Sequence, residues 1–226
     1  MVPSPSEADS HWVRWHQPYE DPASGLSLRL RLVQSAVREV LNGAPPGPIR
    51  VISMCAGQGR DLIDVVAGHP RAADVSAQLV EQDPALVAFA RDRAAAAGVG
   101  DRFAVVEGDA SLSRHYVDAI PADLVLVCGV FGNLVDEGVA ALVAALPSFC
   151  APGANVIWTR HRHPPDLTPA IREWFGSAGF AEVSCEAPPD PYVMTVGRER
   201  LGATPRVKFD PGTRLFDFIG DGGLPV

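Results

Sequence analysis

Val51-Ile-Ser-Met-Cys-Ala-Gly-Gln-Gly-Arg-Asp-Leu62 is the stretch that decides the fold. The apolar run Ile49 to Met54 leads directly into Gly57-Gln58-Gly59, and an amphipathic pattern follows from Arg60 to Ala67. This order predicts a strand, a tight glycine turn and a helix. Glycine takes turn conformations closed to other residues and lets a ligand approach the main chain, while the start of a helix offers free N–H groups. We therefore expect a ligand site at the carboxyl end of this strand, where open α/β sheets bind their ligands.

The composition indicates a chain that builds one sizeable α/β core. It has 226 residues, of which 47% are hydrophobic. No apolar run approaches the ~20 residues of a membrane span, and the polar start, Met1 to Ser10, does not resemble a signal peptide. We expect that start to be disordered and the protein to be cytoplasmic. Residues 1–48 are predicted to form an N-terminal extension, and residues 49–226 the sheet domain.

Charge and cysteine usage exclude several classes of partner. The 19 basic and 27 acidic residues give a net charge of −8, and there is no basic run, so nucleic-acid partners are not expected. Lys208 is the one lysine, and alanine, glycine and proline are abundant, which suggests a bacterial source. The four cysteines, Cys55, Cys128, Cys150 and Cys185, are too scattered for a zinc or redox pair, so no metal site is predicted.

Acidic residues follow two further predicted strands. The strand 75–80 ends at Glu81, and Asp83 and Pro84 suit the cap and the first position of the next helix. Glu81 lies 22 residues after Gly59, close to the ~20 expected for an acid that binds ribose hydroxyls. The strand 102–106 leads into Gly108-Asp109, which is either a ligand-binding acid or an ordinary turn.

The glycine turn and the second strand end resemble the first two motifs of class I S-adenosylmethionine-dependent methyltransferases. Leu62 stands where a dinucleotide fingerprint needs its third glycine, so pyrophosphate binding is disfavoured. The family's loop typically reads D-x-G-x-G-x-G. Ser53 replaces its acid here and Cys55 its first glycine, whereas Gly57 and Gly59 are retained. The resemblance spans about residues 49–200.

The resemblance implies a doubly wound sheet of seven strands, mostly parallel, with an antiparallel C-terminal hairpin, and S-adenosylmethionine as the cofactor. Glu81 would bind the ribose and Asp109 the adenine amino group. Asp61 or Ser53 would hold the methionine ammonium, although a carboxylate at position 61 also suits the first turn of a helix. The cofactor-binding residues are then Ser53, Ala56, Gly57, Gly59, Asp61, Glu81, Gln82, Asp109, Ala110, Cys128 and Gly129.

The acceptor side is expected beside the loop 129–133, which follows a continuous apolar strand, 122–128. Phe131 would line the acceptor, and Asn133 would either orient it or close a turn. His161 is the candidate general base, or a solvated loop histidine. A helix from about Leu26 to Leu41, capped by Ser24 or Ser27, follows an aromatic segment whose His16 and Tyr19 would cover the site or simply pack on the sheet.

The remaining pattern supplies the rest of the fold. Asp136 is predicted to cap a helix, and the last two strands are joined by a proline-rich hairpin, which makes them antiparallel. The expected helices are 85–97, 136–146 and 168–178, and the expected strands are 154–159, 179–185 and 192–199, with 213–219 as a further edge strand.

The sequence therefore predicts an enzyme that transfers a methyl group to a small molecule, as a monomer or homodimer with no membrane or nucleic-acid partner. Two alternatives remain. One is a nicotinamide-dependent oxidoreductase, which Leu62 and the antiparallel hairpin disfavour. The other is a catalytically silent module that binds S-adenosylmethionine.

Overall fold

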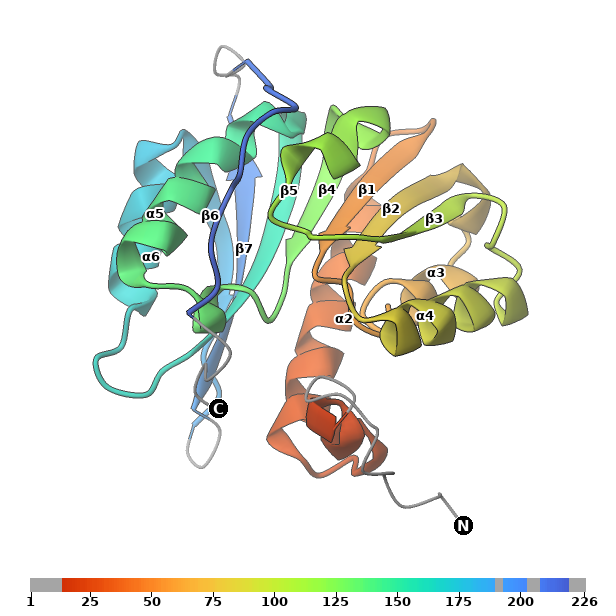
Figure 1. Ribbon diagram of the computed structural model, residues 1–226, viewed down its shortest axis with the longest axis horizontal. Helices are drawn as coiled ribbons and strands as arrows, with labels where there is room; N and C mark the ends of the chain where they lie inside the picture. The colour runs from red at the N-terminus through yellow and green to blue at the C-terminus, as the bar shows by residue number, and fades with distance from the viewer. Residues whose placement is uncertain (1–13, 190–192, 203–207, 220–226) are drawn as a thin grey trace.

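The computed structural model describes residues 14–189, 193–202 and 208–219. Its centre is one seven-stranded sheet of order β3-β2-β1-β4-β5-β7-β6 (Figure 1). The first five strands are parallel, and β7 is antiparallel to both of its neighbours. This confirms the predicted sheet. The strands are β1 (Ile49–Met54), β2 (Val75–Glu81), β3 (Phe103–Glu107), β4 (Ala122–Val127), β5 (Cys150–His161), β6 (Phe180–Glu186) and β7 (Met194–Leu201).

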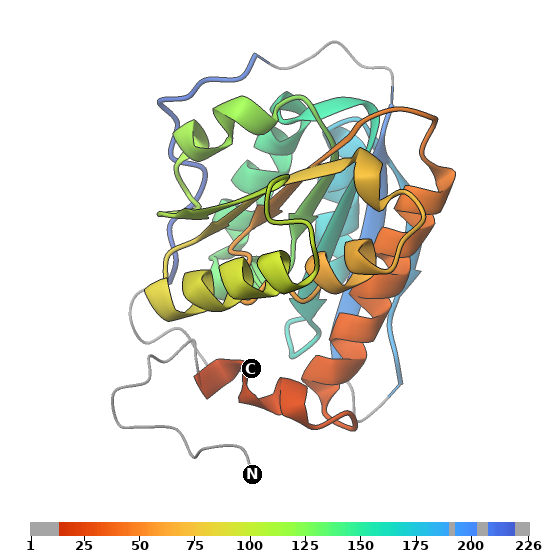
Figure 2. The same ribbon diagram turned by 90° about the vertical axis from the view of Figure 1, so that its right-hand side faces the viewer.

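Helices cover both faces of the sheet (Figures 1 and 2). The α-helices are α2 (Gly25–Gly43), α3 (Ile63–Ala67), α4 (Pro84–Ala96), α5 (Asp136–Ala145) and α6 (Thr168–Ser177), and the 3₁₀ helices include η1 (Gln17–Glu20) and η4 (Phe131–Asn133). Side chains of β4 alternate between the two faces: Leu124 and Leu126 pack with α2, α3 and α4, whereas Val125 and Val127 pack with α5 and α6. None of the described helices has the length and apolar character to cross a membrane.

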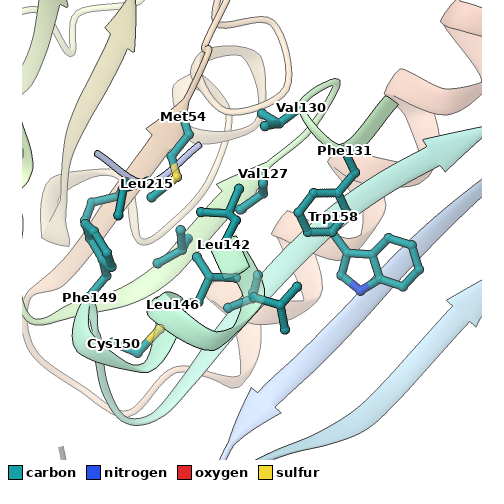
Figure 3. Packing of buried hydrophobic residues seen from close by; sticks show 14 of the residues in the cluster. Met54, Val127, Val130, Phe131, Leu142, Leu146, Phe149, Cys150, Trp158 and Leu215 are labelled. Atoms are coloured by element: carbon teal, nitrogen blue, oxygen red, sulfur yellow. The ribbon is translucent and has the colours of Figure 1, made fainter. Parts of the chain in front are cut away.

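The core beneath α5 and α6 is rich in aromatic rings (Figure 3). Trp158 of β5 stacks on Phe175 at 6.0 Å between ring centroids, and Phe131 lies 5.9 Å from Trp158. Leu215, from the C-terminal segment, packs into the same core near Met54. That segment is therefore held by apolar burial although it belongs to no strand.

Several predicted caps and boundaries are confirmed. Strand β1 has the predicted bounds. The hydroxyl of Ser24 accepts a hydrogen bond from the Ser27 amide at 3.0 Å and caps α2. The carboxylate of Asp83 accepts from the amides of Ala85 and Leu86, with Pro84 as the first helical residue of α4. Local cap chemistry thus fixed these ends.

Two helix starts were predicted wrongly. Helix α3 begins at Ile63 rather than at Arg60, because Gly59 has a φ of +66° and the chain continues as a turn. Asp61 therefore precedes the helix instead of lying in its first turn. Asp136 is the first helical residue of α5 and not its cap; Val135 is at the cap position and makes no side-chain cap hydrogen bond.

The C-terminal third also differs from the prediction. Strand β5 extends to His161, so this histidine belongs to the strand and not to the loop after it. The segment 213–219 is not an edge strand: its one bridge within the described chain joins Arg214 to Leu112. Leu215 and Phe216 are buried in the core, which requires the segment to turn inward. The predicted disorder of Met1 to Ser10 lies outside the described residues.

Candidate active site

The turn after β1 has the backbone that its sequence predicted, and one residue adopts an unexpected conformation. Gly57 and Gly59 have φ of +54° and +66°. Cys55, in the position of the family's first glycine, has a φ of +52° and is the one described residue other than glycine with a positive φ. A Cβ in the left-handed region costs roughly 1–2 kcal/mol. The loop thus keeps a glycine-like geometry although a cysteine occupies the position.

This strain gives a prediction for paired variants at position 55. Both Cys55→Ala and Cys55→Gly remove the sulfur, but only alanine keeps the Cβ. We expect Cys55→Gly to be more stable than Cys55→Ala by about 1 kcal/mol in urea unfolding. At the exposed helical control, Ala88→Gly should instead destabilise by about 1 kcal/mol. An alanine variant as stable as the glycine variant would show that Cys55 is not strained.

Glu81 joins the end of β2 to the glycine turn. Its carboxylate accepts hydrogen bonds from the amides of Gly57 at 2.8 Å, Gln82 at 2.8 Å and Asp83 at 2.9 Å. The residue is only 8% exposed. Burial raises the pKa of Glu81, and the three amide donors partly offset that effect. The carboxyl group is therefore fixed beside the turn at the carboxyl edge of the parallel strands.

Asp109 lies beyond the end of β3 and contacts the C-terminal segment. Arg214 forms an ion pair with its Oδ2 at 3.3 Å and donates to the Ser111 hydroxyl at 2.9 Å. Burial acts to raise the pKa of Asp109, but hydrogen bonds from Ser111 and the charge of Arg214 outweigh it and leave the pKa lowered. Asp109 is thus an ionised acceptor held by a residue more than a hundred positions away in sequence.

The N-terminal segment, the red start of the described chain in Figure 1, lies at the end of the sheet where the parallel strands finish. A Cβ placed on Gly57 would lie 2.4 Å from Nε2 of His16, so the imidazole rests directly on the turn. The rings of Trp15 and Tyr19 lie 5.0 and 5.5 Å from that imidazole. His16 therefore lies over the glycine turn, and the role of His16 and Tyr19 in covering a ligand stays a prediction.

Arg29, Asp61 and Cys128 interact electrostatically near this cover. The Tyr19 hydroxyl accepts a hydrogen bond from Arg29 at 3.1 Å. Oδ1 of Asp61 is buried without a hydrogen-bond partner, and burial raises the pKa of Asp61 to about 6 against the opposing charge of Arg29. Burial and the nearby Asp61 also raise the pKa of the Cys128 thiol. Asp61 and Cys128 are thus brought together here from different strand ends.

The loop after β4 is closed by its own polar groups. Asn133 donates from Nδ2 to the Gly129 carbonyl at 2.8 Å, and the Gly129 amide donates to the Thr159 hydroxyl at 2.8 Å. Of the two expectations for Asn133, closing a turn is the one its contacts support. Nδ1 of His161 is buried without a partner, and burial together with Arg160 and His163 lowers the pKa of His161. His161 is therefore neutral at pH 7 and able to accept a proton.

The remaining predicted site residues differ in their exposure. Phe131 was expected to line the acceptor, but its side chain is 0% exposed and packs on Trp158 and Phe175 in the core. That expectation is wrong for this conformation, because the ring supplies apolar packing. Ser53 and Ala110 are buried, Ala56 lies at the turn with its amide bonded to the Val80 carbonyl, and Gln82 is exposed at the strand end.

Three residues of this region were missed in the sequence. Arg29 follows Leu26 by three positions, so it borders the apolar stripe of α2. This spacing is the sequence feature that could have placed Arg29 next to the sheet domain. Thr159 and Arg214 gave no such signal, since each reaches its partner only through the tertiary fold. Within the described residues no group of three histidine, cysteine or acidic side chains is placed to hold a metal ion.

Comparison with solved structures identifies the fold. Magnesium protoporphyrin IX methyltransferase from Synechocystis PCC 6803, solved with bound S-adenosylmethionine, aligns over 86% of this chain and 92% of its own at 15% identity, with a TM-score of 0.67. An O-methyltransferase family protein from Burkholderia thailandensis aligns over 85% of this chain at 16% identity, with a TM-score of 0.59. An O-methyltransferase family 2 protein from Planctomyces limnophilus DSM 3776, in complex with apigenin, aligns over 76% at 19% identity, with a TM-score of 0.52.

The chain spans 63% and 61% of the length of the latter two proteins. No protein-family model matches the sequence, and no curated protein is significantly similar to it. The strand order, the antiparallel β7 and these alignments agree with one another. The chain has the fold of the class I S-adenosylmethionine-dependent methyltransferases.

Proposed function

We propose that this protein transfers a methyl group from S-adenosylmethionine to a small-molecule acceptor. The observation that carries the proposal is the contact between the Glu81 carboxylate and the Gly57 amide, 2.8 Å apart. It places an acid suited to ribose hydroxyls directly beside a turn suited to close ligand approach. The solved neighbours with this fold include one with bound S-adenosylmethionine.

When bound, S-adenosylmethionine supplies an activated sulfonium carbon for attack by the acceptor. The residues then act by positioning. Glu81 would accept from the ribose hydroxyls, Asp109 from the adenine amino group, and Gly57 and Gly59 would admit the methionine end. Alignment in a site closed to water supplies roughly 7–11 kcal/mol of barrier lowering. The cover formed by residues 14–43 would exclude water, which gives the N-terminal extension, residues 1–48, its role beside the sheet domain, residues 49–226.

His161 is the proposed proton acceptor when the nucleophile is a hydroxyl or an amine. Its unpartnered Nδ1 and lowered pKa leave it unprotonated near neutral pH. An acceptor that is already ionised needs no such base. The net charge of −8 supports a small molecule over a nucleic acid as acceptor. A cytoplasmic, bacterial protein working as a monomer or homodimer is part of the same proposal.

Calorimetric titration tests the cofactor directly. We expect S-adenosylmethionine and S-adenosylhomocysteine each to bind at one site per chain, and NADH to leave the fluorescence of the protein unchanged. Binding of NADH instead would favour the oxidoreductase alternative. Methylated product from a panel of phenols, amines and carboxylates would establish catalysis; binding with no product from any acceptor would favour the silent module.

A further inference from the structure

We propose that Arg29 and Asp61 form a clamp for the α-amino-acid end of the cofactor, with Arg29 binding the carboxylate and Asp61 the ammonium. The proposal rests on the proposed function, since it names how one end of S-adenosylmethionine is recognised. It assigns a binding role to the N-terminal helix α2, which the sequence motifs do not include.

Arg29 is held in place by the cover. Its Nη2 donates to the Tyr19 hydroxyl at 3.1 Å, and its guanidinium lies over the Trp15 ring, 4.9 Å from the centroid. These contacts use one edge and one face of the guanidinium. A planar guanidinium has five N–H donors in a fixed fork, so further donors are left for a carboxylate. Arg29 is thus a positioned cation with hydrogen-bonding capacity to spare.

Asp61 presents the opposite charge. Its Oδ1 is buried and accepts no hydrogen bond, which is costly for a carboxylate and is ordinarily relieved by a partner. Arg29 is the strongest charge acting on Asp61, yet the two side chains form no ion pair among the described contacts. The two opposite charges therefore interact without forming an ion pair, and each side chain retains hydrogen-bonding capacity for a ligand group.

A zwitterion matches this arrangement better than a single ion does. An anion alone would leave Oδ1 of Asp61 without a hydrogen bond, and a cation alone would be repelled by Arg29. An α-amino acid carries both charges a few bonds apart. The turn residues Gly57 and Gly59 lie close to Asp61 in the chain, and the His16 imidazole of the cover lies over Gly57. Ser53, buried at the position of the family's acid, has no carboxylate to offer, so Asp61 would replace that acid.

The test compares two ligands that differ only at this end. S-adenosylhomocysteine carries the amino-acid group, whereas 5′-methylthioadenosine keeps the nucleoside and the sulfur without it. Arg29→Met should weaken binding of S-adenosylhomocysteine about tenfold and change the affinity for 5′-methylthioadenosine by less than twofold. Asp61→Asn should show the same selectivity. Arg31→Met is the matched control: Arg31 is on the same helix, exposed, and bonds the Pro22 carbonyl, so both affinities should stay unchanged.

The outcomes distinguish a failure of the clamp from a failure of the proposed function. An equal loss for both ligands in Arg29→Met would mean that Arg29 only supports the cover, and would overturn the clamp. So would unchanged affinity for S-adenosylhomocysteine in a variant with a normal unfolding temperature. If the unaltered protein binds 5′-methylthioadenosine as tightly as S-adenosylhomocysteine, the amino-acid group adds no affinity. The clamp would then be wrong, whereas the proposed nucleoside site would remain supported. If it binds neither ligand, the proposed function itself fails.

Discussion

Replacing Glu81 with alanine is expected to weaken binding of S-adenosylmethionine and S-adenosylhomocysteine at least tenfold, which is about 1.4 kcal/mol or more. The affinity for both ligands should fall by the same factor, because they share the ribose that Glu81 is proposed to bind. The hydrogen bonds from ribose hydroxyls to a carboxylate are charge-assisted, and they form in a site where Glu81 is only 8% exposed. Calorimetric titration of the variant measures the loss.

The variant must also be shown to fold, because Glu81 accepts from three backbone amides. Leaving such donors unpaired costs about 1–3 kcal/mol each when they stay buried. Glu81→Gln keeps the side-chain shape and an oxygen for Gln82 and Asp83, so it should fold better and still bind weakly. Glu107→Ala is the matched control, since Glu107 is the register partner of Glu81 on β3 and is exposed. Unchanged affinity in a folded Glu81→Ala would remove Glu81 from its proposed role.

The second large effect concerns stability and pH, and it comes from Glu199 on β7. Glu199 is 1% exposed, and its carboxylate accepts a hydrogen bond from the indole nitrogen of Trp158 at 3.4 Å. Burial raises the pKa of Glu199 from 4.5 to about 7; the Trp158 donor opposes this, Glu182 adds to it, and Arg172 opposes it. The folded protein therefore holds a proton that the unfolded chain releases at lower pH.

The difference between the two pKa values determines how stability changes with pH. Between pH 4.5 and 7 the unfolded chain ionises Glu199 while the folded protein does not, so the free energy of unfolding falls as the pH rises. This loss of stability from Glu199 amounts to about 3 kcal/mol at pH 8, and there is no loss below pH 4.5. Asp61 and Glu81, whose pKa values are also raised, act in the same direction, so a variant is needed to isolate Glu199.

Glu199→Gln keeps an oxygen for Trp158 and cannot ionise. We expect it to be more stable than the unaltered protein at pH 8, by up to about 3 kcal/mol, and of similar stability at pH 4.5. Urea unfolding at several pH values gives the two curves. Glu186→Gln, an exposed position on the neighbouring strand β6, should leave the pH dependence unchanged. Parallel curves for Glu199→Gln and the unaltered protein would show that Glu199 is ionised in the fold.

Local patterns predicted most of the elements and misplaced those whose ends depend on packing. The caps at Ser24 and Asp83 were readable because a side chain bonds an amide two or three residues away. The start of α3 was predicted wrongly because the apolar pattern begins at residue 60, whereas the positive φ of Gly59 makes the residues before Ile63 a turn. Phe131 was misread because an aromatic ring in a ligand loop and one in a core look alike in sequence.

The sequence by itself determined the sheet, the glycine turn and the acid that contacts it. These follow from short-range rules: apolar alternation sets strands, glycine permits positive φ, and parallel strands bring their carboxyl ends to one edge. Only the tertiary structure decided that His16 rests on Gly57, that Arg29 bonds the Tyr19 hydroxyl, and that Arg214 pairs with Asp109. Such partners are set by how helix α2 and the C-terminal segment pack on the sheet, and packing joins residues that no spacing along the chain relates.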